Sequence, residues 1–172
     1  MNDPDPAELW EEVRGWLRVA QADQRTARLG LTADPPLCGV AAFHCQQAAE
    51  KLLKGFLVRG LVDFGKTHDL DRLGRSVLAR FPDLVPLVVP LRPWTLWSVA
   101  YRYPGEAGAE PEPSIAELSR ALDLIARLDA ALRALAPNAA ARPSGRPGAA
   151  DFLPEGPPQD PPVPPEDALG FD

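Results

Sequence analysis

The chain has 172 residues and a mass of 18.6 kDa, which suits one domain with a proper hydrophobic core. Its net charge of -6 and pI near 5.0 disfavour a protein that binds nucleic acid over a broad basic surface, although a local basic pocket stays open. No apolar run reaches the roughly 18 residues of a membrane span. The acidic start MNDPDPAELW is also unlike a signal peptide, so we expect a cytoplasmic protein that does not engage a membrane.

Helical periodicity accounts for the first part of the chain. Asp5 is expected to cap a first helix over residues 6–30, because proline favours the first helical position and apolar residues follow at steps of three and four. Asp34 and the proline after it repeat this signal and predict a second helix over residues 35–59. Gly60 marks its end.

The later segments continue the pattern. Thr67 is expected to cap a third helix that stops before Pro82, and Ser114 and Glu117 predict a capping box at the start of a long last helix. Prolines interrupt the segment between these helices, which still keeps one apolar helix face through Leu91, Trp94, Trp97 and Tyr101. The fold class is therefore all-α, an up-down bundle of four to five helices.

The composition changes near Pro137. Residues 137–172 hold ten of the 21 prolines and a net charge of -4, with too few clustered aliphatic residues to offset chain entropy. We therefore expect a helical bundle over residues 1–136, with a net charge near -2, and a disordered, proline-rich, acidic tail over residues 137–172.

The second helix carries a polar line in the stretch FHCQQAAEKLLKGFL. Gln47, Glu50 and Lys54 fall on one side when residues are set about 100° apart. One interpretation is a solvated face on which Glu50 and Lys54 form an exposed pair, worth about 0.2 to 0.5 kcal/mol. The other is a functional site.

The two cysteines, Cys38 and Cys45, are expected to be reduced and buried. Seven helical residues separate their Cα atoms by roughly 10 Å, beyond the roughly 7 Å reach of a disulfide. A structural zinc site would need both of them and both histidines at unusual spacings. We expect no metal and no cofactor.

FHCQQAAEKLLKGFLVRG, followed by KTHDL and then by YRYPG before a long helix, resembles the HEPN domain, the higher eukaryotes and prokaryotes nucleotide-binding family. The resemblance covers about residues 9–135. It implies a small helical bundle that often forms homodimers and is commonly encoded beside a minimal nucleotidyltransferase in toxin-antitoxin-like pairs. Many members cut RNA without a metal.

Ribonuclease members of the family carry an Arg followed, after four to six residues, by a His. That pattern is absent here: Arg102 lies where the motif's Arg is found, but no His follows it, and eight residues separate Arg59 from His68. His68 and Arg102 are still the catalytic candidates. A His can move the protons of the attacking and leaving oxygens, and an Arg can hold the phosphate.

Three functions remain open at this stage. The first is a HEPN-like module that binds a nucleotide, RNA or a nucleotidyltransferase partner, the second a metal-independent ribonuclease, and the third an oligomerising scaffold that recruits others through its tail. For the first, the candidate binding residues are Gln47, Glu50, Lys54, Lys66, His68 and Arg102.

Overall fold

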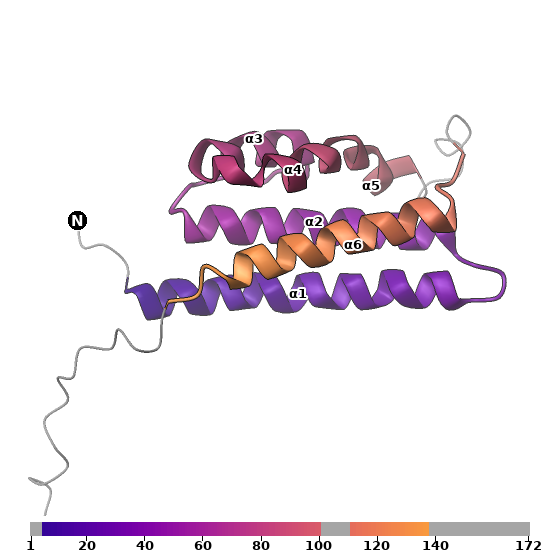
Figure 1. The fold of residues 1–172 in the computed structure, drawn as a ribbon, viewed down its shortest axis with the longest axis horizontal. Helices are drawn as coiled ribbons and strands as arrows, with labels where there is room; N and C mark the ends of the chain where they lie inside the picture. Colours follow the sequence, from indigo (N-terminus) through magenta and orange to yellow (C-terminus); the bar gives the residue numbers. More distant parts are fainter. Residues whose placement is uncertain (1–4, 101–110, 138–172) are drawn as a thin grey trace, which may run out of the picture. The chain divides into compact units, whose positions relative to one another are not determined.

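Two long antiparallel helices begin the fold. The structure, a computed structural model, describes residues 5–100 and 111–137. Helix α1 spans Pro6–Thr32 and α2 spans Cys38–Arg59, and a short loop joins them (Figure 1). The predicted cap of α1 is confirmed, because an Asp5 carboxylate oxygen accepts a hydrogen bond of 2.9 Å from the Ala7 amide.

The predicted boundary between these helices was wrong by a few residues. Gly30 does not end α1, which runs on to Thr32; a Cβ at Gly30 would lie 3.3 Å from the Leu37 carbonyl oxygen, so this glycine allows the close approach of the chain entering α2. Asp34 does not cap α2, which starts at Cys38. Two consecutive prolines explain the delay, since a residue before proline is disfavoured in the α conformation.

Helix α3 spans Leu70–Arg80 and stops before Pro82, as predicted. Its cap is Asp69 rather than Thr67, because the Asp69 carboxylate accepts from the amides of Asp71 and Arg72. Thr67 lies two residues earlier, where its hydroxyl oxygen accepts a hydrogen bond from the Asp69 amide at 3.3 Å.

The proline-rich segment after α3 folds into short pieces. They are the 3₁₀ helix η1 (Pro82–Leu84), α4 (Val85–Val88), the 3₁₀ helix η2 (Val89–Leu96) and α5 (Trp97–Ala100). Leu91 and Trp94 are buried, and the Trp94 and Trp97 rings stack with centroids 5.0 Å apart. Two of the predicted face residues are therefore core residues, while Tyr101 lies outside the described residues.

Helix α6 spans Ile115–Arg133 and begins with the predicted capping box. The Ser114 hydroxyl oxygen accepts from the Glu117 amide at 3.3 Å, and the Glu117 carboxylate accepts from the Ser114 amide at 2.8 Å. Ile115 is 48 % exposed and does not join the core, whereas Leu118, Leu122, Ile125 and Leu132 are buried and form the core-facing stripe of this helix.

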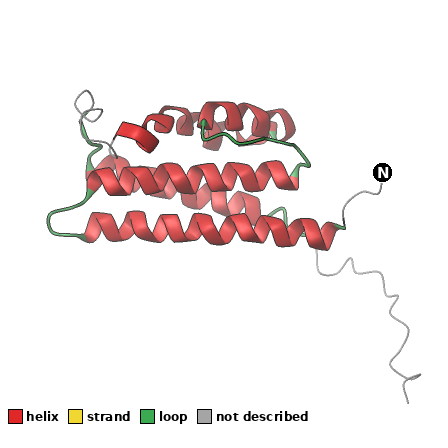
Figure 2. Cartoon of the chain, turned by 180° about the vertical axis from the view of Figure 1, so that it is seen from behind, coloured by secondary structure: helices red, strands yellow, loops and turns green. Residues whose placement is uncertain are grey.

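Helix α2 is the central element. It packs along α1, carries α3, η2 and α5 on another side, and contacts α6, which also contacts α1 (Figures 1 and 2). The described residues form no strand, which confirms the all-α prediction. None of their helices is long and apolar enough to span a membrane. The predicted tail lies outside the described residues, except for Pro137.

Candidate functional site

A buried carboxylate lies in the middle of α2. Glu50 is fully buried and Lys54 is 8 % exposed. The cause is the central position of α2, which is covered by neighbouring elements on several sides and so has little face left for water. The interpretation of Glu50 and Lys54 as an exposed surface pair is therefore wrong.

Three cationic or polar groups converge on this carboxylate. The Lys54 ammonium lies 2.7 Å from Glu50 Oε1, and the Lys51 ammonium lies 3.7 Å from the same atom. The His68 Nδ1 atom is 3.1 Å from both carboxylate oxygens. Two ammonium groups thus face one carboxylate, which leaves a local surplus of one positive charge when His68 is neutral.

Aromatic rings hold Lys54 in place. Its ammonium lies 5.7 Å from the centre of the Trp16 ring and 5.9 Å from that of the Phe64 ring. These two rings also pack edge to face, with centroids 6.1 Å apart. The attraction of a cation to ring faces adds to the ion pair and keeps the lysine directed inward.

Two glutamines extend this group of side chains, which we call the Glu50 network: Gln46, Gln47, Glu50, Lys51, Lys54 and His68. The Gln46 amide donates to Glu50 Oε2 at 3.3 Å and to the His68 backbone carbonyl at 3.4 Å. Gln47 donates to the Gln46 amide oxygen at 2.7 Å and accepts from Lys51 at 2.7 Å. Sequence reasoning selected Gln47 and missed Gln46, which is fully buried. The available signal was the four-residue spacing of Gln46 and Glu50, which places them on neighbouring turns.

His68 joins this network from the loop between α2 and α3. Its side chain is 75 % exposed, although its partner Glu50 is buried. An ionised carboxylate only accepts hydrogen bonds, so Nδ1 carries the proton and Nε2 of the neutral ring is left as an acceptor. The buried side chain therefore fixes the ring and tautomer of an accessible imidazole, as a general base or a ligand-binding group requires.

The charge state of Glu50 follows from its neighbours. Burial by itself raises the pKa of this carboxyl group, but the hydrogen bond from Lys54, the charges of Lys51 and Lys54 and the hydrogen bond from His68 outweigh burial and leave the pKa below its ordinary value. Glu50 is thus ionised at neutral pH and acts as an acceptor.

A family model described as the HEPN domain matches residues 13–130. The chain belongs to the HEPN domain family. The comparison with curated proteins and the comparison with solved structures gave no match. The matched range contains Glu50, Lys54 and His68, so the buried network lies inside the HEPN domain.

The structure brings four of the six predicted binding residues into one network, namely Gln47, Glu50, Lys54 and His68. Lys66 is exposed, two residues before His68 in the same loop. Arg102, the other catalytic candidate, lies outside the described residues. Its position relative to Glu50 and His68 therefore stays a prediction.

The cysteines of this HEPN domain are free thiols, as expected. Cys45 is buried as expected, but the expectation of burial was wrong for Cys38, which is half-buried at the first position of α2. Burial raises the pKa of the Cys45 thiol to about 12, against a smaller lowering by the charge of Arg28. Across residues 5–100 and 111–137, no group of three or more His, Cys, Asp or Glu side chains is arranged to hold a metal ion.

Proposed function

We propose that this HEPN domain binds the phosphate groups of a nucleotide or RNA at the exposed edge of the Glu50 network. The observation that carries the proposal is the exposed His68 imidazole fixed by a buried carboxylate. The positive surplus from Lys51 and Lys54 and the exposed Lys66 in the same loop favour an anionic ligand.

Binding can be tested by calorimetry with ATP and with a short single-stranded RNA. His68→Asn should weaken binding, because it removes the imidazole at the edge of the site. His44→Asn is a matched control, since His44 is the other histidine and pairs with Asp23 at 2.8 Å rather than with Glu50. Equal weakening in both variants, or no binding to the wild type, would refute this function.

The second part of the proposal concerns partners. The domain forms a homodimer and associates with a minimal nucleotidyltransferase in a toxin-antitoxin-like pair, as its family membership suggests. Co-expression with the protein encoded by the neighbouring gene, followed by co-purification and light scattering, tests both points. A protein that elutes as a monomer without the neighbouring gene product would contradict both points.

A metal-independent ribonuclease is the second candidate, and the pairing of Glu50 with His68 favours it. A carboxylate that orients an imidazole prepares Nε2 to accept the proton of an attacking 2′-hydroxyl. Arg102 would hold the phosphate in this reaction. RNA cleavage should persist in chelator and be lost in His68→Ala; equal cleavage by both proteins would indicate a contaminant.

A further inference from the structure

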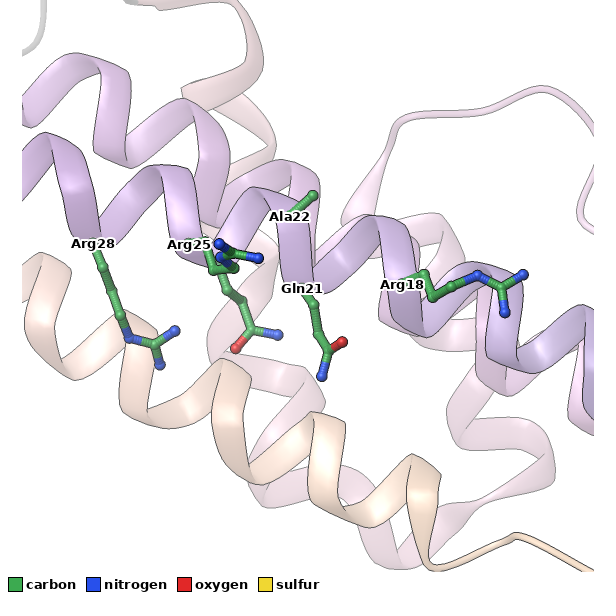
Figure 3. A pocket seen from close by; sticks show the side chains of 6 residues that line it. Arg18, Gln21, Ala22, Arg25 and Arg28 are labelled. Carbon is green, nitrogen blue, oxygen red and sulfur yellow. The ribbon is translucent and has the colours of Figure 1, made fainter.

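A second charged feature lies on α1, outside the Glu50 network. Figure 3 shows Arg18, Arg25 and Arg28 projecting from this one helix, with Gln21 and Ala22 between Arg18 and Arg25. Together with Gln24 these residues line a pocket of about 380 Å³. Its volume lies within the range of small-molecule sites, roughly 300 to 1,000 Å³. We call it the α1 arginine pocket.

The arginines of this pocket have few carboxylate partners. Arg25 and Arg28 are exposed, and neither forms an ion pair with a described residue. Arg18 lies 3.4 Å from Glu11, which also pairs with Arg14. Among the residues that the structure describes, no acidic side chain lines the pocket. Its positive charge is therefore largely uncompensated, in a chain whose net charge is -6.

Gln24 adds an observation that points to a ligand. It is only 6 % exposed, and its amide nitrogen has no hydrogen-bond acceptor among the described residues. A buried donor without an acceptor costs stability. Gln24 lines the pocket together with the arginines, so an oxygen of a bound anion can supply the acceptor that this buried nitrogen lacks once the amide turns toward it.

We propose that the α1 arginine pocket is a phosphate-binding site. Guanidinium groups give forked hydrogen bonds to phosphate oxygens, and the Gln24 amide gives a further neutral donor. Arg18 and Arg28 lie ten positions apart on α1, a rise of about 15 Å, so the pocket can contact more than one phosphate group. Polyphosphate chains of nucleotides and RNA backbones share this chemistry.

The site is separate from the proposed HEPN function. None of its lining residues is Glu50, Lys54 or His68, and the arginines lie on α1 rather than on α2 or the loop after it. The loss of tripolyphosphate binding in Arg25→Glu/Arg28→Glu should therefore also be seen when both proteins carry His68→Asn, in which the imidazole of the Glu50 network is absent. This measurement shows whether the α1 arginine pocket binds phosphate independently of whether the Glu50 network binds a ligand.

The test uses calorimetry of the full chain with three probes, namely sodium tripolyphosphate, ATP and a short single-stranded RNA. Arg25→Glu/Arg28→Glu should weaken binding about tenfold or more, as expected for the loss of charged hydrogen bonds. Arg72→Glu on α3 is the control, because it changes the charge in the same direction at an exposed site and α3 does not contact α1.

The probes distinguish the sources of the phosphate. Arginine-dependent binding of all three, with RNA displacing tripolyphosphate, identifies an RNA backbone; binding of tripolyphosphate and ATP alone identifies a nucleotide. Equal affinities of the double variant and the Arg72→Glu control, or no binding of any probe, would overturn the proposal.

A variant of the buried amide gives an independent check. Gln24→Met keeps the size of the side chain and removes the unsatisfied donor, so it should weaken tripolyphosphate binding without lowering the melting temperature. A lower melting temperature with unchanged binding would show that Gln24 has only a structural role.

Discussion

His68 Nδ1 lies 3.1 Å from both carboxylate oxygens of Glu50, although one side chain is exposed and the other buried. The contact ties the loop before α3 to the middle of α2. Glu50 therefore has two partners, because the same carboxylate orients His68 and also pairs with Lys54 in the interior at 2.7 Å. Stability and the accessible chemistry of this HEPN domain therefore depend on one side chain.

Glu50→Ala should destabilise the fold by roughly 3 to 5 kcal/mol, since it leaves Lys54 buried without its carboxylate. Urea unfolding followed by circular dichroism measures the free energy. Glu12→Ala, an exposed residue of α1, is the control and should change stability by less than about 0.5 kcal/mol. A similarly small effect of Glu50→Ala would show that the ion pair of Glu50 and Lys54 does not stabilise the fold.

The lowered pKa of Glu50 predicts a pH dependence. Its pKa in the folded protein lies below the ordinary value of 4.5, so the folded state binds this proton more weakly than the unfolded chain. The resulting stability is fully present above about pH 4.5 and is lost as the pH falls through the folded pKa.

The comparison of wild type with Glu50→Gln isolates this contribution, because the other carboxylates are common to both proteins. The difference in their free energies of unfolding should stay constant near neutral pH and shrink as the pH falls below about 4.5. A difference that stays constant down to acid unfolding would show that Glu50 has an unperturbed pKa.

The burial of Glu50 shows where sequence reasoning reached its limit. Helical spacing placed Gln47, Glu50 and Lys54 on one side of α2, but a polar line is compatible with either water or a covered network. Segments distant in the sequence determine that the line is covered, because α3 and η2 pack on α2 and the loop before α3 brings His68 to Glu50. Gln24 was missed for a similar reason, since its missing acceptor is a property of the packed protein.

Local signals predicted the helices better than their ends. Asp5 and the pair of Ser114 and Glu117 were read correctly because capping involves residues only two or three apart. The starts of α2 and α3 were misplaced where a second proline or a second capping residue competed with the predicted one.

The capping box of α6 should contribute measurably to stability. Ser114→Ala should cost about 1 kcal/mol, because the Glu117 amide loses its acceptor. Thermal unfolding measures the effect. Ser119→Ala on the same helix is the matched control, since the Ser119 hydroxyl only donates back to the Ile115 carbonyl. Equal shifts in both variants would contradict a specific role of the cap.

The two thiols should differ in reactivity. Cys45 is fully buried with a pKa of about 12, whereas Cys38 is half-buried at the start of α2. In a native protein treated with Ellman's reagent, the fast phase should disappear in Cys38→Ser and persist in Cys45→Ser. Two thiols reacting at one rate before unfolding would contradict the burial of Cys45.

A ligand site at Glu50 and His68 can be observed at the His68 ring itself by nuclear magnetic resonance. The chain has only two histidines, so the imidazole proton signals of His68 and His44 can be assigned by single substitution. A titration with ATP and with a short RNA is best performed on Arg25→Glu/Arg28→Glu, in which the α1 arginine pocket is removed. We predict a saturable shift of the His68 signals with those of His44 unchanged; His68 signals that stay fixed throughout both titrations would contradict a ligand site at Glu50 and His68.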